Sequence, residues 1–485
     1  MGAMVAVVNK RGGNAVPATI AMLRSLKHRG TDAHGVATQA SVEIARSLEE
    51  LEDIDLNYNM AIGYNFSRIT SNDMAQPVLG DDHASVFNGR FFPEKTYTDR
   101  FTSRLQANLE EEARRILKEL DGAYAFAVSN SGKLVAGRDA YGLIPLYYGE
   151  DENICGLASE RKALWTLGMR NVRSFPPGNI AAMDTQGFAF EKVATITQPR
   201  VRSISMKAAA EHLRLLLLES TTERVKDVEQ IAVAFSGGLD SAVVALLAKM
   251  SGVQVHLISV GLEDQQELRH AERAGIALGL PFHIQTYDVG DVENAVSKVL
   301  WLIEEPNPMK VGVAIPFFWA AEIASRIGCP VLLSGQGCDE LFAGYRRYLA
   351  DLDQKGMQAL RNILYHDVVS SHETNFQRDY PVCAFQRIEL RLPFIDREVV
   401  SFALSLPLKL KIDSVQDLLR KRVLRRVAEN MEMPYFITHR TKKAIQYSTG
   451  VSKALKKLAK SEDLTVSDYL NKLFCETFPD LEALS

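Results

Sequence analysis

The chain of 485 residues has no long hydrophobic run, no paired cysteines and no excess of charge of one sign. No apolar stretch approaches the roughly 18 to 20 residues that a helix needs to cross a bilayer. The first residues lack the charged start and the apolar segment that a secretory signal peptide requires. We therefore expect a protein without a membrane partner and without an export signal.

Cysteine is scarce: five residues, odd in number and without a CxxC pair. They are Cys155, Cys329, Cys338, Cys383 and Cys475. This spacing argues against a disulfide framework and against a thiolate zinc site. Reduced thiols are typical of cytoplasmic proteins, so we expect a cytoplasmic location.

Charge is nearly balanced, because 56 Lys and Arg face 60 Asp and Glu for a net charge of −4. The basic excess of a dedicated nucleic-acid binder is missing, and we expect no nucleic-acid partner. Hydrophobic residues make up 46% of the chain, which is close to the globular average and argues against disorder. At about 150 residues per domain, the length indicates two or three domains.

Hydrophobic patterning divides the chain into two parts. Residues 1–198 read mainly as short strands and turns with two helices, the pattern of packed sheets in an α+β domain. An irregular stretch around Pro199 follows. From residue 206 to 485, strands expected at 231–235, 255–260 and 282–287 alternate with helices, and the chain is mainly helical from about residue 320. This alternation predicts an α/β domain with a parallel sheet.

The clearest chemical signal is a glycine-rich turn between an apolar strand and a helix. It reads Ser236-Gly237-Gly238-Leu239-Asp240-Ser241. Such a turn lies at the carboxyl end of a sheet, where open α/β sheets bind ligands. Glycines let backbone N–H groups approach an anion, and the helix N-terminus and the serines add donors. The turn predicts a phosphate site, and the missing GK[ST] ending argues against a P-loop ATPase.

Four segments of the second part carry motifs in a characteristic order. SGGLDS at 236–241 is similar to the loop of N-type ATP pyrophosphatases, which cleave ATP between the α and β phosphates. LSGQGCDELFAGY at 333–345 is similar to a signature usually written SGEGxDExFGGY, and ELRLPFID at 389–396 to ExRxPFLD. RTKK at 440–443 is similar to the late segment that carries a catalytic lysine. Together, in this order, the four segments resemble the asparagine synthetase family, and the resemblance implies an ATP pyrophosphatase domain over 206–485.

This resemblance implies that a carboxylate attacks the α-phosphate of ATP and that a nitrogen nucleophile then displaces AMP. Charge builds on the leaving pyrophosphate, so ATP is expected with Mg²⁺ and fixed cations. The implied catalytic residues are Lys442, Glu304 and Asp339, and the implied Mg²⁺ ligands are Asp240 and Asp339. The implied ATP contacts are Ser236, Gly237, Gly238, Asp240, Ser241, Val260, Ser334 and Gly335.

LKHRGTD at 26–32, FNG at 87–89, LDGAYAF at 120–126 and GRDAYG at 137–142 are similar to motifs of a class II glutamine amidotransferase domain. This resemblance implies an Ntn-hydrolase-like sandwich over 1–198. Its glutamine-site positions fall on Gly2, Arg68, Asn88, Gly89 and Asp99. The family carries its nucleophilic Cys at position 2, and glycine has no nucleophile. Either the leading residues replace a native Met-Cys start, or the domain is a degenerate scaffold. Glutamine and free ammonia both stay open as nitrogen donors, and a homodimer stays open as the assembly.

The favoured function is the ATP-dependent amidation of a carboxylate, with aspartate converted to asparagine. The stretch 307–316 departs from the family's aspartate segment, which leaves the acceptor open. Other hypotheses are intramolecular amide formation as in β-lactam synthetases, amidation of a modified nucleobase, and a non-catalytic nucleotide-binding regulator. A missing tyrosine partner near Glu304 argues against the first, and a missing cysteine cluster against the second. The retained glycine turns, Asp339 and Lys442 argue against the third.

Overall fold

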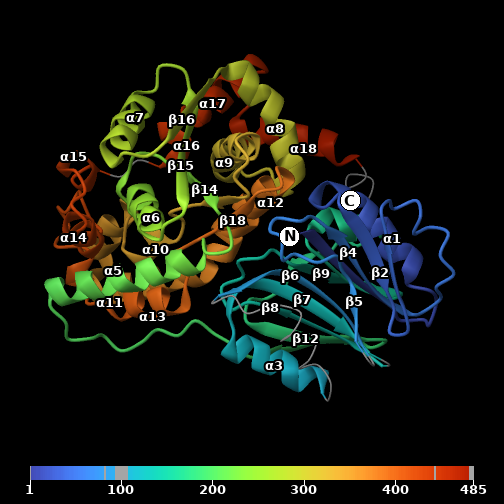
Figure 1. The fold of residues 1–485 in the computed structure, drawn as a ribbon. Coiled ribbons are helices and arrows are strands. Elements are labelled where there is room, and N and C mark those ends of the chain that lie inside the picture. The colour runs from blue at the N-terminus through green and yellow to red at the C-terminus, as the bar shows by residue number, and fades with distance from the viewer. Residues whose placement is uncertain (1, 81–82, 93–107, 131, 442–443, 480–485) are drawn as a thin grey trace. The chain divides into compact units, whose positions relative to one another are not determined.

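The computed structural model describes residues 2–80, 83–92, 108–130, 132–441 and 444–479. Two predicted site residues, Asp99 and Lys442, lie outside the described residues. The chain forms two compact units, one of Met1–Thr195 with Phe478–Ser485 and one of Ile196–Thr477. Figure 1 shows the elements of each unit. None of the described helices is long and apolar enough to cross a membrane.

The first unit is built on two antiparallel sheets. One sheet has the strand order β11-β9-β10-β1-β4-β2-β3, and the other has the order β13-β12-β8-β7-β6-β5. The strands are β1 (Gly2–Asn9), β2 (Ala33–Ala37), β3 (Val42–Ala45), β4 (Met60–Phe66), β5 (Val78–Leu79), β6 (Ala84–Phe92), β7 (Asp121–Ser129), β8 (Leu134–Arg138), β9 (Tyr147–Glu150), β10 (Ile154–Ala158), β11 (Arg173–Ser174), β12 (Asn179–Asp184) and β13 (Gly187–Lys192). Strands β6 and β7 lie against β4, so the two sheets face each other.

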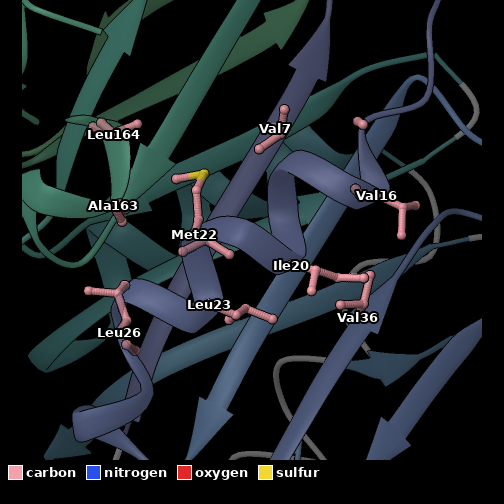
Figure 2. Packing of buried hydrophobic residues seen from close by; sticks show 14 of the residues in the cluster. Val7, Val16, Ile20, Met22, Leu23, Leu26, Val36, Ala163 and Leu164 are labelled. Carbon is pink, nitrogen blue, oxygen red and sulfur yellow. The ribbon is translucent and has the colours of Figure 1, made fainter. Parts of the chain in front are cut away.

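Helices cover the outer faces of this sandwich. They are α1 (Val16–Ser25), α3 (Leu109–Glu119) and α4 (Arg161–Trp165). Figure 2 shows Ile20 and Leu23 of α1 in the cluster that also contains Val7 of β1. Because alternate residues of a strand face opposite sides, Met4 and Val8 point away from α1, and both are fully buried. Strand β1 is therefore apolar throughout, as a strand covered on both faces must be.

The second unit contains a five-stranded parallel sheet in the order β16-β15-β14-β17-β18. The strands are β14 (Gln230–Ala234), β15 (Gln254–Leu262), β16 (Phe282–Tyr287), β17 (Val331–Leu333) and β18 (Glu389–Arg391). The chain moves outward from β14 to β16 and then returns to the other side of β14 with β17. This reversal creates a crevice at the carboxyl ends of β14 and β17, where such sheets bind ligands.

Helices flank the sheet and make up most of the remaining unit (Figure 1). They are α5 (Met206–Glu223), α6 (Leu239–Met250), α7 (Gln266–Leu278), α8 (Val289–Ile303), α9 (Pro308–Arg326), α10 (Cys338–Leu341), α11 (Arg347–Ser371), α12 (Gln377–Phe385), α13 (Arg397–Ser405), α14 (Arg422–Asn430), α15 (Tyr435–Thr438), α16 (Ile445–Ser448), α17 (Val451–Ser461) and α18 (Val466–Thr477). The predicted fold class is confirmed: an α+β sandwich precedes an α/β parallel-sheet unit with a helical C-terminal region.

Candidate active site

A cavity of about 770 Å³ lies at the carboxyl ends of β14, β15 and β17. Seven of the predicted nucleotide-site residues line this one cavity. They are Ser236, Asp240, Ser241, Val260, Ser334, Gly335 and Asp339. The two glycine turns, about a hundred residues apart in the chain, therefore meet at one site because β14 and β17 are neighbours in the sheet.

The first glycine turn is shaped by Gly237. Its φ is 67°, and a Cβ atom at this position would lie 2.7 Å from the Cα atom of Ala271. Gly238 has no such restriction and serves as the N-cap of α6. The Ser236 side chain is exposed, and the Ser236 backbone N–H donates to Ser241 Oγ at 3.2 Å. The turn thus presents hydroxyls and a helix N-terminus to an anion.

A buried lysine joins the two turns. Lys421 Nζ lies 2.6 Å from Asp240 Oδ2 and 2.6 Å from Asp339 Oδ1. Burial by itself would lower the pKa of Lys421, but the two carboxylates outweigh burial and raise the pKa above its ordinary value. The ammonium therefore stays charged and holds both carboxylates at the wall of the cavity.

The ion pair between Lys421 and Asp339 lies so close to the backbone of residue 344 that only glycine fits there. A Cβ atom there would lie 1.9 Å from Asp339 Oδ1 and 2.1 Å from Lys421 Cε. Lys421 was not among the site residues predicted from the sequence. Its only local signal is a run of three basic residues, Arg420-Lys421-Arg422, which is commonly a solvated face.

Asp240 and Asp339 fit the donor set that Mg²⁺ prefers. In proteins Mg²⁺ is held by one or two carboxylates together with substrate phosphates and water. Among the described residues no cluster of three or more His, Cys, Asp or Glu could hold a metal by itself. The second oxygen of Asp240 accepts from the Cys338 thiol at 3.1 Å, and burial raises the pKa of that thiol. Any cation here would need oxygen atoms of the nucleotide to complete its shell.

The same cavity extends from the second glycine turn to a polar wall. Gln336 Nε2 donates to Asp379 Oδ2 at 2.7 Å, and Arg378 donates to both oxygens of Asp379 at 2.7 and 2.9 Å. Asp379 is fully buried, and burial raises the pKa of its carboxyl despite the guanidinium. Gln336 and Arg378 line the cavity.

Glu340 stands on this wall and is 3% exposed. Its Oε1 accepts from the Tyr345 hydroxyl at 2.7 Å and from Asn375 Nδ2 at 2.9 Å. Its Oε2 is buried and has no hydrogen-bond partner among the described residues. Burial and the neighbouring Asp339 raise the pKa of Glu340.

The predicted catalytic Glu304 lies elsewhere. It follows α8 in the left-handed conformation with a φ of 56°, is 6% exposed, and does not line the cavity. Lys310, in the stretch 307–316 that departs from the family's pattern, forms an ion pair with Glu305 at 2.6 Å. The structure thus brings Asp339 but not Glu304 to the cavity beside the glycine turn at 236–241. The catalytic role of Glu304 stays a prediction.

In the first unit, Gly2 is buried at the start of β1. A Cβ atom on Gly2 would lie 2.0 Å from the Asn65 carbonyl oxygen and 2.7 Å from the Tyr64 ring. The Tyr64 hydroxyl donates to Asn88 Oδ1 at 3.3 Å. Tyr64 thus lies next to Gly2 and is hydrogen-bonded to Asn88, and both of these are predicted glutamine-site positions. Asn88 Nδ2 is buried without a hydrogen-bond partner among the described residues.

The other two described positions of the predicted glutamine site, Gly89 and Arg68, differ in exposure and packing. Gly89 has a φ of 129°, and a Cβ atom there would lie 1.9 Å from the Ala123 carbonyl oxygen, so only glycine fits. Arg68 is exposed, and its backbone N–H donates to Asp32 at 2.8 Å. The structure therefore joins Gly2 and Asn88 through Tyr64, while Arg68 stays at the surface.

Comparison with known proteins identifies relatives of both units. The family model described as asparagine synthase matches residues 212–355 and 352–483, and the one described as a glutamine amidotransferase domain matches residues 65–166. The chain is 30% identical to the putative glutamine-hydrolysing asparagine synthetase 1 of Methanocaldococcus jannaschii, over 94% of this chain and 95% of that protein. It is 25% identical to asparagine synthetase B of Escherichia coli, over 88% and 78%.

Among solved structures, a glutamine phosphoribosylpyrophosphate amidotransferase from B. subtilis matches 58% of this chain and 65% of its own. The TM-score is 0.35 and the sequence identity is 18%.

Proposed function

Because the chain belongs to the asparagine synthetase family, we propose that it activates aspartate as an acyl-adenylate and converts it to asparagine. The chain is an ATP-dependent carbon–nitrogen ligase of that family. The observation that carries the proposal is the single cavity shared by Ser236, Asp240 and Asp339, with Lys421 between the two carboxylates. AMP and pyrophosphate are the proposed products.

In this mechanism the turn at 236–241 binds the β- and γ-phosphates. Backbone N–H groups and the hydroxyls of Ser236 and Ser241 supply fixed donors, and the N-terminus of α6 supplies a favourable dipole. Donors already in place cost no reorganisation when charge develops on the leaving pyrophosphate. Asp240 and Asp339 are the residues that would hold Mg²⁺, which would supply positive charge against the phosphates. We assign a further stabilising cation to Lys442, as the family resemblance implies.

We propose that the chain with glycine at position 2 takes its nitrogen from free ammonia. The amidotransferase match at 65–166 supports glutamine as the donor within the family. A glycine offers no thiolate for attack on the glutamine amide. The tight contacts around Gly2 with Asn65 and Tyr64 favour a domain in which the nucleophile position has been given up.

The variant Gly2→Cys tests this assignment. We expect no glutaminase activity and a loss of about 1–3 kcal/mol in the free energy of unfolding, because the new side chain overpacks the start of β1. The measurements are glutamate release and urea unfolding, with mass spectrometry to establish that Met1 has been removed. The variant Gly2→Ala is the matched control, since it adds the Cβ without the thiol. If Gly2→Cys hydrolysed glutamine and Gly2→Ala did not, position 2 would accommodate the family's nucleophilic cysteine, and the expected absence of glutaminase activity in this variant would be wrong.

The proposed reaction is tested by the fate of ATP. With aspartate, ammonia and Mg²⁺, we expect AMP and pyrophosphate in equal amounts with asparagine, and no ADP. An Asp339→Asn variant should lower this rate by about 100-fold or more, because the site loses a carboxylate that would hold Mg²⁺ and that pairs with Lys421. ADP as the product, or no AMP with any carboxylic acid while ATP still binds, would contradict the proposal.

A further inference from the structure

The first glycine turn contains a peptide group that its flanking residues leave free to reverse, the one between Gly237 and Gly238. Reversing a peptide changes ψ of the residue before it and φ of the residue after it. Glycine adopts φ values of either sign at little cost, and the two residues have φ values of 67° and −84°. The direction of this peptide must therefore come from what its carbonyl and N–H groups contact.

The two ends of this peptide have different partners. The Gly238 N–H donates to Ser236 Oγ at 3.3 Å, and Ser236 lines the cavity. Because the peptide is trans, its carbonyl points the opposite way. There His270 Nε2 donates to the Gly237 carbonyl oxygen at 2.9 Å, and Nε2 carries the proton because a carbonyl oxygen can only accept. In the reversed peptide the carbonyl oxygen would face the cavity and repel phosphate oxygens.

The imidazole of His270 is held beside the turn by its neighbours. His270 is half-buried on α7, and two other residues of this helix, Leu268 and Ala271, line the cavity. Phe436 of α15 packs edge-on against the imidazole, with ring centroids 5.8 Å apart. The guanidinium of Arg273 lies 4.2 Å above the Phe436 ring. The imidazole therefore has a defined place from which it can fix the direction of the peptide.

We propose that His270 is a positioning residue for the phosphates of ATP. Its hydrogen bond keeps the carbonyl of the Gly237–Gly238 peptide away from the cavity and the N–H of that peptide toward it. This inference rests on the proposed binding of the β- and γ-phosphates at the turn. It deepens that function, because it names a side chain outside both glycine turns on which phosphate affinity depends. His270 acts through the backbone of the turn and contacts no substrate.

A purely structural role of His270 predicts a different result from a positioning role. A ring that only packed α7 against its neighbours would, when removed, weaken every nucleotide that enters the cavity. A ring that directs one peptide should matter only to ligands whose phosphates reach the turn. AMP carries the α-phosphate alone, whereas ATP also carries the two phosphates assigned to the turn. Comparing AMP with an ATP analogue therefore separates the two roles.

Calorimetry on the full chain with Mg²⁺ makes this comparison without requiring turnover. The two ligands are AMP and an ATP analogue whose α–β bridge is a methylene group. His270→Leu should weaken the analogue about 10-fold, the upper range for one hydrogen bond, and should leave AMP unchanged. His212→Leu is the matched control, because His212 is exposed and its ring packs on Phe402 with centroids 4.6 Å apart. It should bind both ligands as the parent chain does.

A second substitution tests the direction of the peptide itself. In the reversed peptide residue 238 would need a positive φ, which alanine disfavours and glycine does not. Gly238→Ala should therefore hold the observed direction without the imidazole. We expect His270→Leu to weaken the analogue about 10-fold in the parent chain, but less than about 3-fold in a chain that already carries Gly238→Ala. Unfolding midpoints of all variants are measured alongside to detect a folding defect.

Three outcomes overturn the inference. One is unchanged binding of the analogue by His270→Leu, another is equal weakening of AMP and the analogue, and the third is an equal loss with glycine and with alanine at position 238. The proposed function fails separately. If His270→Leu weakens the analogue selectively but the parent chain forms no AMP from ATP and aspartate, adenylation is lost and the role of His270 stands. If the parent chain forms AMP and His270→Leu keeps its KM for ATP, adenylation stands and the role of His270 is lost.

Discussion

Replacing Lys421 with Met should lower the free energy of unfolding by about 3–5 kcal/mol, the range found when one partner of a buried ion pair is removed. The lysine is 2% exposed and lies 2.6 Å from each of two carboxylates, which would be left facing each other without a counter-charge. The same variant should lower AMP formation by at least about 100-fold, because two groups that face the phosphates lose their fixed positions. Urea unfolding and a product assay measure the two effects.

Arg422→Met is the matched control for this experiment. Arg422 is the next residue, and its ion pair with Asp413 at 2.6 Å lies at the surface. Exposed pairs contribute only about 0–1 kcal/mol, so this variant should unfold almost as the parent chain does. If Lys421→Met and Arg422→Met proved equally stable, Lys421 would not hold the two turns together.

The second large effect is expected at Gly237. An alanine there would adopt a left-handed conformation, which costs about 1–2 kcal/mol, and its Cβ would lie within 2.7 Å of the Ala271 backbone. The turn has to move, and a displacement of about 1 Å can lower a rate about 100-fold. We therefore expect Gly237→Ala to lower kcat/KM for ATP by about that factor.

The neighbouring glycine supplies the comparison. Gly238 has an ordinary φ of −84°, and a Cβ there would meet only Ser236 Oγ at 3.2 Å. Gly238→Ala should therefore cost much less activity than Gly237→Ala, although both remove a glycine from the same turn. Steady-state kinetics with varied ATP measure the difference. Equal losses would mean that the turn needs flexibility rather than one defined shape.

The central strands of the second unit were predictable because they are locally encoded. Strands β14, β15 and β16 are apolar runs that end at turn residues, and the predicted ranges differ from the observed ones by at most two residues. The strands β17 and β18 were missed, since each has three residues within a region that reads as helical. Strand β18 contains two buried charged residues, Glu389 and Arg391, which pair with each other. Arg391 also pairs with Asp227, which is distant in the sequence.

The candidate site likewise contains residues that could be predicted from the sequence and residues that could not. The two glycine turns were recognised because their spacing is local, and the sheet then brings them together. Lys421 was missed because its partner Asp240 is 181 residues earlier in the chain, and no local pattern marks a lysine for such a contact. The polar wall was missed for the same reason. Gln336 and Asp379 are 43 residues apart, and the unpaired oxygen of Glu340 is a property of three-dimensional packing alone.

The ammonium of Lys421 has a consequence for the chain when it holds no ligand. Without a counter-charge, Asp240 and Asp339 would repel each other and favour a larger separation of the two glycine turns until a cation bound between them. Here the polypeptide supplies its own permanent counter-ion from a distant segment. The ion pairs of Lys421 therefore fix the relative positions of Asp240 and Asp339 without any bound ligand.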